Sequence, residues 1–289
     1  MEAIQSYYLY KDSLKRQREE KKKMSQTRQA RIRSIAVSWL IEALKTVLGY
    51  EDVRNKIVKY VNPDLENKEH MRTFDAFQQY DVPPYLEKAV EIIDYCEDII
   101  EDPQITGKVL MTASNIQESA DDMLTHYQTF IINKDTKHVY SVDPAHKTKG
   151  KGIYDPTISR TVVFPIFRSY GYTCQYVPLR HPAQTNKNDV FCQTWSLLIA
   201  LNILDNYDDF GVVEIPCIRE KTKKYQMLLD FYKKIMGNLP AIQRELDIAY
   251  IELVNHNREY ISEHCPFKSI AEINTCELLE SMTVEDMME

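Results

Sequence analysis

Hydrophobic residues recur at intervals of three and four in the first third of the chain. The interval connects Ile35 to Val47, and it returns after Pro83 and Pro84. Apolar residues at this interval line one side of an α-helix. The pattern therefore predicts a helical N-terminal region over residues 34–108.

The pattern changes in the middle of the chain, where short segments are rich in β-branched and aromatic residues. Four such segments, separated by turn-forming residues, read YQTFIIN, KHVYSVD, RTVVFPIF and YTCQYVPL. Segments of this kind are typical of β-strands. Intervals of three and four then return from Cys192 onwards, which predicts further helices. The sequence thus predicts an α+β fold with a central, mainly antiparallel sheet flanked by helices and a helical N-terminal extension.

Composition limits the classes of protein to which the chain can belong. Hydrophobic residues make up 44% and charged residues 27% of the 289 residues, which provides enough apolar area for a packed core. Only 7 glycines occur, and none forms the glycine-rich loop with which nucleotide-binding proteins hold phosphates. The six cysteines are scattered without a C-x-x-C pair. Reduced thiols are therefore expected, rather than a disulfide framework or a structural metal site.

Charge is distributed unevenly along the chain. The formal net charge is -7, yet residues 11–33 hold ten Lys or Arg against three Asp or Glu. This predicts three regions: a basic arm over residues 1–33, the helical region over 34–108, and a domain over 109–289 that carries the sheet. The first residues are charged where a signal peptide would be apolar, and no run of 18 apolar residues occurs. We expect no membrane segment and no export through a signal peptide.

Two of the predicted strands form a hairpin that brings a histidine and an aspartate together. A turn centred between Lys134 and Asp135 pairs residues whose numbers sum to 269. His126 and Asp143 meet this condition, so their Cβ atoms should lie about 5 Å apart on one face of the sheet. A carboxylate in that place accepts a hydrogen bond from one imidazole nitrogen and fixes the orientation of the ring.

Cys192 is the candidate nucleophile. It opens the predicted helix CQTWSLLIALNIL, where unpaired N–H groups and the helix dipole favour a thiolate. A thiolate beside an imidazolium attacks a carbonyl carbon, and N–H groups of the first helical turn help to stabilise the oxyanion that forms. The preceding polar stretch offers a side-chain amide for the same purpose, with Gln184 as the first candidate.

Each of these residues also has an ordinary structural explanation. His126 alone suits a half-buried histidine before a strand, Asp143 followed by proline suits a turn, and Cys192 suits a core thiol. A dyad of His181 with Cys192 is a further alternative, although it provides no group to orient the ring. The order of base, orienting acid and nucleophile, together with the hairpin geometry, favours the catalytic interpretation.

These residues and their spacing resemble a clan of papain-like cysteine proteases that includes the SUMO proteases, the adenovirus proteinase and the asfarvirus maturation protease. The resemblance rests on His126 and Tyr127 at the start of a strand, the step to Asp143, and a glutamine upstream of Cys192. It spans about residues 109–210. The string DVFCQTWSL is similar to the versions carried by large DNA viruses, whereas an Asp-Cys-Gly string is usual in the cellular ones.

The resemblance implies a role for each matching residue. His126 matches the general base, Asp143 the orienting acid and Cys192 the nucleophile. Gln184 lies eight residues before Cys192, whereas the clan places its oxyanion glutamine six or seven residues before the nucleophile. This difference keeps Asn186 open as the oxyanion donor.

Two aromatic residues are candidates for substrate binding. Tyr127 stands where the SUMO proteases have a tryptophan that clamps a glycine pair, so the substrate channel should have an aromatic wall. Trp195 is the second candidate, although its spacing with Leu198 and Ile199 is most simply explained by a core position.

The resemblance implies a thiol endopeptidase that cuts precursor proteins at glycine-containing sites, as in the maturation of viral structural proteins. Such an enzyme would work in a virion or in the host cytoplasm. A protease that removes ubiquitin-like modifiers, a binding protein with a dead site, and an acyltransferase are the alternatives.

The basic arm, residues 11–33, allows two interpretations. A run of charges of this kind is usually a solvated tail. The adenovirus proteinase uses DNA as a cofactor, so the resemblance implies nucleic acid as a candidate partner and activator, held by the arm through phosphate contacts. No other cofactor and no metal is expected.

Overall fold

The computed structural model describes most of the chain, and two compact units are distinguished in it. The first unit, Lys45–Ile242, is called the sheet unit below, and the second, the terminal unit, combines Met1–Leu44 with Gln243–Glu289. The predicted boundaries of the three regions stay a prediction. The described residues are 26–61, 73–80, 86–118, 123–145, 158–177, 179, 181–184, 191–205 and 220–288.

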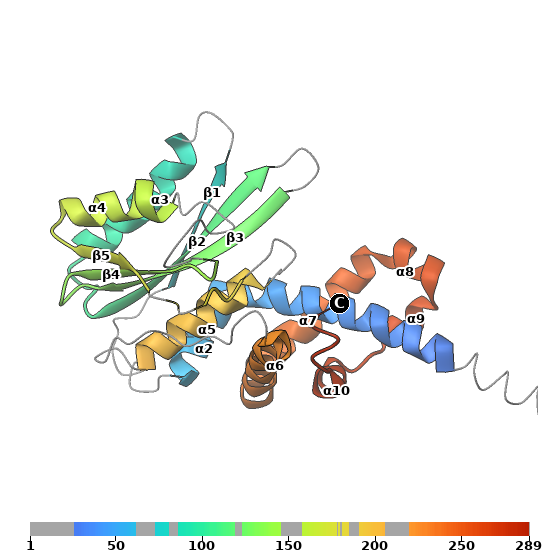
Figure 1. Ribbon diagram of the computed structural model, residues 1–289. Coiled ribbons are helices and arrows are strands. Elements are labelled where there is room, and N and C mark those ends of the chain that lie inside the picture. The colour runs from blue at the N-terminus through green and yellow to red at the C-terminus, as the bar shows by residue number, and fades with distance from the viewer. Residues whose placement is uncertain are drawn as a thin grey trace, which may run out of the picture. The chain divides into compact units, whose positions relative to one another are not determined.

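A five-stranded sheet forms the centre of the sheet unit (Figure 1), and its strands lie side by side in sequence order. The central pairings, β2 with β3 and β3 with β4, are antiparallel, whereas β1 pairs with β2 and β4 with β5 in parallel. The predicted α+β fold with helices on the sheet is confirmed, and the sheet is mixed, with parallel pairings at both edges. The strands are β1 (Thr73–Tyr80), β2 (Lys108–Glu118), β3 (Met123–Asn133), β4 (His138–Val142) and β5 (Thr173–Tyr176).

Helices account for most of the remaining described residues. The helical character predicted for residues 34–108 is confirmed for residues 34–48 and for the next two helices, but β1 is a strand inside that range. The first of these helices begins earlier, at residue 26, inside the predicted basic arm. The sheet unit contains α2 (Glu51–Val61), α3 (Leu86–Glu101), the π-helix η2 (Ile158–Val163), α4 (Phe164–Ser169), α5 (Cys192–Asp205) and α6 (Lys221–Asn238). The others are α7 (Pro240–His256), α8 (Arg258–His264), α9 (Phe267–Ala271) and α10 (Thr275–Ser281).

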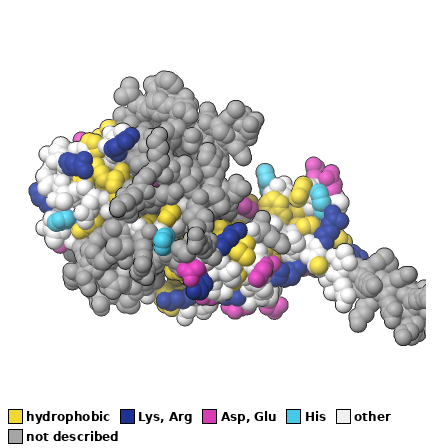
Figure 2. Space-filling view, in the orientation of Figure 1, with side chains coloured by type: hydrophobic (Ala, Val, Ile, Leu, Met, Phe, Trp, Pro, Cys, Tyr) yellow, Lys and Arg dark blue, Asp and Glu magenta, His cyan; other side chains and the backbone are white. Residues whose placement is uncertain are grey.

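The segment RTVVFPIF is helical, so the strand predicted there is wrong. It forms the end of η2 and most of α4. Val163, Phe164 and Phe167 are buried. Phe167 follows the other two by four and three residues, which is the spacing of a helix that packs one side against a core. The intrinsic β preference of the branched and aromatic residues is overridden by this packing. Arg168 of α4 is exposed. Figure 2 shows Lys and Arg side chains beside hydrophobic ones on the visible face of the molecule.

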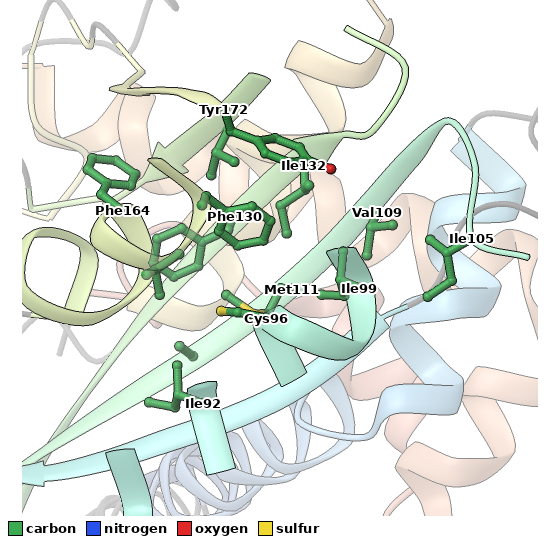
Figure 3. Close-up of a cluster of buried hydrophobic side chains, with 14 residues drawn as sticks. Ile92, Cys96, Ile99, Ile105, Val109, Met111, Phe130, Ile132, Phe164 and Tyr172 are labelled. Atoms are coloured by element: carbon green, nitrogen blue, oxygen red, sulfur yellow. The ribbon is translucent and has the colours of Figure 1, made fainter. Parts of the chain in front are cut away.

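One hydrophobic core lies between the sheet and the helices α3, η2 and α4. Figure 3 shows Cys96 of α3 pointing toward Met111 of β2. The strands contribute alternate residues and α3 contributes residues at intervals of three and four, as the two periodicities require. All members are at most 6% exposed: Ile92, Cys96, Ile99, Ile105, Val109, Met111, Ala113, Phe130, Ile132, Val139, Val163, Phe164, Phe167 and Tyr172.

The helix α5 contacts β3 and lies on the other side of the sheet from α3 and α4 (Figure 1). Ser196 of α5 donates a hydrogen bond from Oγ to the carbonyl oxygen of Tyr127 at 2.9 Å. Residues 191–197 are all buried. Since burial extends around the whole circumference of these turns, polar side chains included, packing holds the start of α5 in place.

β3 and β4 form the predicted hairpin, but their register differs from the prediction. The observed pairs, such as Thr129 with Val142, have numbers that sum to 271. The turn holds four residues, 134–137, and Lys137 in it has a φ of 52°. The side-chain oxygen of Asn133 accepts a hydrogen bond from the N–H of Thr136 at 3.0 Å, which closes this longer turn.

The shift in register changes how His126 and Asp143 face each other. Because side chains alternate between the two faces of a sheet, a shift of two residues leaves both on the same face. They are diagonal neighbours rather than directly opposite residues, and diagonal neighbours remain within reach of each other.

Arg54 closes the C-terminal end of the helix formed by residues 26–48. Its Nη1 donates to the carbonyl oxygens of Leu48 at 3.1 Å and Gly49 at 2.7 Å, and the residue is 1% exposed. The last carbonyl groups of a helix lack partners within the helix, and a positive charge there complements the helix dipole. Gly49 also lies against α5, because a Cβ added to it would be 3.2 Å from Nε2 of Gln193.

Within the terminal unit, an ion pair joins the N-terminal helix to the end of the chain. The guanidinium of Arg33 donates to both carboxylate oxygens of Asp286 at 2.6 Å, and also to the carbonyl oxygen of Ser281 at 3.0 Å. These bonds, helped by Thr283, hold the pKa of Asp286 below its usual value. Among the described residues, no helix is both long and apolar enough to cross a membrane.

Candidate functional site

The predicted pair of His126 and Asp143 is formed. Nε2 of His126 lies 2.8 Å from Oδ1 of Asp143, and the two residues are 1% and 3% exposed. Asp143 follows the last residue of β4, and its Oδ1 also accepts a hydrogen bond from the N–H of Ala145 at 2.9 Å. This local bond is typical of an aspartate that begins a turn. It fixes the carboxylate, which in turn fixes the imidazole ring.

The surroundings of His126 favour its protonated form. Burial alone would lower the pKa of the ring, but the charge of Asp143, the hydrogen bond to Asp143, and the hydrogen bond and charge of Cys192 raise it from 6.5 to about 10. An opposite charge in contact with a buried group outweighs the loss of hydration in this way. The imidazolium form of the ring is therefore favoured.

Cys192 completes the arrangement as the first residue of α5. Its side chain lies close enough to His126 to raise the pKa of the ring, and the residue is 4% exposed. Since Nε2 of the ring faces Asp143, Nδ1 is the nitrogen that can exchange a proton with the thiol. The N–H of Trp195 donates to the carbonyl oxygen of Phe191 at 2.9 Å, so α5 starts with Cys192 and directs its first N–H groups toward this end.

Two other thiols lie in different surroundings. Burial raises the pKa of Cys96 to about 12 and that of Cys174 to about 11. Neither would ionise near neutral pH, and an uncharged buried thiol is a poor nucleophile. Both pack in or against the hydrophobic core, which is the ordinary structural role of a cysteine.

Gln184 is buried next to the turn that carries Asp143. It is 1% exposed, and its backbone N–H donates to the carbonyl oxygen of Pro144 at 2.8 Å. This contact ties the segment before α5 to the loop after β4. The oxyanion role of Gln184 stays a prediction, and its alternative, Asn186, lies outside the described residues.

The two aromatic candidates for substrate binding differ in their surroundings. Tyr127 is half-buried on β3. Trp195 is completely buried, and the ammonium of Lys224 lies 5.3 Å from the centre of its ring. Lys224 is itself 2% exposed. Trp195 therefore offers no surface to a substrate in this conformation, in agreement with the core explanation of its spacing.

Sequence reasoning missed a group of buried polar residues beside the pair of His126 and Asp143. Gln128 and Ser141 occupy positions on the core face of β3 and β4, and Ser159 of η2 contacts both. A signal was present for Gln128, because it stands between His126 and Phe130 at the two-residue interval of one strand face. The described residues contain no cluster of His, Cys, Asp and Glu that could hold a metal ion.

Comparisons with known proteins show a distant likeness in fold. No protein family and no curated protein matches the sequence. Among solved structures, the effector protein RavZ of Legionella pneumophila is similar with a TM-score of 0.30 and 9% identity, over 67% of this chain and 70% of RavZ. A deletion variant of AvrA with IP6 and CoA has a TM-score of 0.31 and 8% identity, over 89% and 98%. Values this low carry no argument about function.

Proposed function

We propose that this protein is a cysteine-type endopeptidase with Cys192 as nucleophile, His126 as general base and acid, and Asp143 as the orienting acid. The observation that carries the proposal is a cysteine at a helix start that raises the pKa of a nearby imidazole, which is itself hydrogen-bonded to a buried carboxylate. Three ordinary core residues rarely adopt this order of contacts.

The proposed reaction uses the three residues in sequence. The Cys192 thiolate attacks the peptide carbonyl carbon, and the oxyanion that forms is stabilised by N–H groups at the start of α5 and by the amide of Gln184 or Asn186. His126 then gives its proton to the leaving amine, which leaves a thioester on Cys192. Water, deprotonated by His126, hydrolyses the thioester and restores the thiolate and imidazolium.

The substrates in this proposal are proteins with glycine at or next to the cut bond, such as precursors processed during maturation of a virus particle. A narrow channel beside Tyr127 would reject any Cβ near the scissile carbonyl, so glycine has a chemical reason to be selected. The residues that support this are the three of the site together with the half-buried Tyr127. A protease for ubiquitin-like modifiers shares the same chemistry and differs in requiring a folded substrate.

The decisive experiment tests Cys192 directly. The wild type should cleave a peptide library at glycine-containing sites, and a peptide electrophile that ends in Gly-Gly should label Cys192. Cys192→Ala should abolish both while it keeps the far-UV CD spectrum of the wild type. Turnover by Cys192→Ala would refute the assignment, and cleavage of a ubiquitin-like fusion without cleavage of the peptides would favour the second class of substrate.

Nucleic acid is proposed as a partner of the basic arm, residues 11–33. The part of the arm from residue 26 onwards is helical, with Arg28 and Arg31 exposed. Binding of a labelled oligonucleotide should weaken steeply as salt rises, because phosphate contacts release counterions. Deletion of residues 1–25, which keeps Arg33 and its ion pair, should reduce that binding and its salt dependence. Equal and weak binding by both proteins would leave the arm as a solvated tail.

A further inference from the structure

A buried polar cluster lies on the core face of the sheet, directly beside Asp143. Gln128, Ser141 and Ser159 are at most 1% exposed. Oγ of Ser159 donates to Oε1 of Gln128 at 2.7 Å, and the Oγ atoms of Ser141 and Ser159 lie 3.2 Å apart. Because Ser159 uses its proton on Gln128, Ser141 must be the donor in the second bond. The carbonyl end of the Gln128 side chain is thus fixed toward η2.

The register places the cluster next to the catalytic pair. One step beyond the pair of Thr129 and Val142, Gln128 lies opposite Asp143, on the same face of the sheet as His126. Tyr176 pairs with Ser141 across the next strands. Its pKa is raised by burial and is also affected by the hydroxyl of Ser159 and the charge of Asp143. The cluster and the carboxylate therefore lie within electrostatic reach of each other.

The nitrogen end of the Gln128 side-chain amide indicates what the residue does. Its Nε2 is buried and forms no hydrogen bond with the described residues. Buried donors in folded proteins are almost always satisfied, by protein or by an ordered water molecule. Since Oε1 is held by Ser159, the NH2 group is the end left for the neighbouring strand, where Asp143 is the acceptor opposite. A small rotation or one bridging water would connect them.

We propose that Gln128, held in place by Ser159 and Ser141, is a positioning residue that supports the carboxylate of Asp143. This inference rests on the proposed function of the same site. A donor on the carboxylate favours its ionised form and fixes its orientation, which keeps His126 protonated and directed at Cys192.

Other titratable and charged groups also face this site. Cys192 reaches the ring from α5, Tyr176 comes from β5, and Arg160 of η2 and Arg168 of α4 act on Tyr176. None of these side chains is itself replaced when Gln128 is changed, and the Ser159→Ala variant described below reports any effect that passes through Ser159 to Tyr176. A shift in the titration of the site on replacing Gln128 therefore reports the lost amide.

The test measures alkylation of Cys192 by iodoacetamide as a function of pH, with the modified peptide quantified by mass spectrometry. This readout needs no substrate and separates Cys192 from the other cysteines. In the wild type, the alkylation rate should rise with pH as the thiolate forms beside the imidazolium. This rise at the acid end of the profile is called the acid limb. Gln128→Met, which keeps the size of the side chain and removes the donor, should move that limb up by about one pH unit, the usual effect of one hydrogen bond to a charged group.

Two further variants control for a loss of packing. Ser159→Ala releases the amide of Gln128 and should shift the limb in the same direction by a smaller amount. Phe130→Leu loosens the next position on the same strand face and should lower the melting temperature while the limb stays in place. If Gln128→Met does not fold, the pair of Ser159→Ala and Phe130→Leu decides the question.

The outcomes separate this inference from the proposed function. A lower melting temperature with an unmoved limb in Gln128→Met, or an equal shift in Phe130→Leu, would overturn the positioning role. If the wild type shows the limb but cleaves no peptide, the proteolytic function fails and the positioning role stands. A wild-type thiol that titrates like free cysteine would overturn both.

Discussion

Replacement of Asp143 by Asn should separate the charge of this residue from its role in packing. The size of the side chain is kept, and an oxygen remains to accept the N–H of Ala145. The negative charge beside His126 is lost. Burial lowers the pKa of the ring in the wild type, and Asp143 more than offsets it to give a value of about 10. Without that charge burial dominates, so the pKa of His126 should fall below 6.5.

The raised pKa predicts how stability depends on pH. Between pH 6.5 and about 10, folded His126 keeps a proton that the unfolded chain releases. The free energy of unfolding must therefore fall as the pH rises through this range. The stabilisation is fully present below pH 6.5 and is lost above about 10. At about 1.4 kcal/mol per pKa unit, His126 should account for a loss of roughly 2 kcal/mol between pH 6.5 and 8.

Urea unfolding followed by CD, at several pH values in this range, measures the effect. For the stability curves, both proteins also carry Cys192→Ala, because a thiolate at Cys192 would release a proton and offset the one that His126 keeps. The difference between the two curves then isolates His126, and turnover is measured with Cys192 present. The variant should lack the fall of roughly 2 kcal/mol. Its turnover should drop by up to about 10⁴-fold, the effect of the same change in a serine-type triad. Parallel stability curves and unchanged turnover would show that Asp143 is only a turn residue.

Three more changes test other parts of the molecule. Gln184→Ala should slow turnover on the order of 10²-fold with little change in KM, as one oxyanion donor does; if Asn186→Ala shows this loss instead, the donor is Asn186. Arg33→Ala should lower the free energy of unfolding by about 1 kcal/mol at neutral pH, since its ion pair with Asp286 is partly exposed. The pKa of Asp286 is lowered in the folded protein, so the difference from the wild type should vanish as the pH falls and Asp286 is protonated. Gly49→Ala places a methyl group 2.9 Å from a backbone carbonyl oxygen and should cost about 1–3 kcal/mol in thermal or urea unfolding; a wild-type midpoint would show that the loop adjusts freely.

The sequence was sufficient for features that follow from local periodicity. The hairpin of β3 and β4, the strand β5 and the start of α5 at Cys192 were all predicted, because alternation and three-four spacing are properties of a single segment. The contact of His126 with Asp143 was predicted for the same reason. A register error of two residues preserves the face on which each side chain lies.

Features that depend on distant segments were not predictable in this way. The turn after β3 is held partly by the residue that precedes β2, because the N–H of Lys134 donates to the carbonyl oxygen of Gly107 at 2.8 Å. No pattern within the hairpin reports that bond, so the four-residue turn was taken for a shorter one. The helix α4 was mistaken for a strand because Phe164 and Phe167 satisfy a core that the sheet and α3 define. Tertiary packing decides such short apolar segments.

The N–H of Gln184 donates to the carbonyl oxygen of Pro144 at 2.8 Å, so the place of this amide is set by the loop after β4. The number of residues between Gln184 and Cys192 can then differ from one protein to another, because the positions of both ends are fixed by other contacts. A search signature that requires a set number of residues between amide and nucleophile would pass over such a chain. A signature that measures the position of Gln184 from the turn after Asp143 would retain such a chain, so distant relatives are better sought by that second measure.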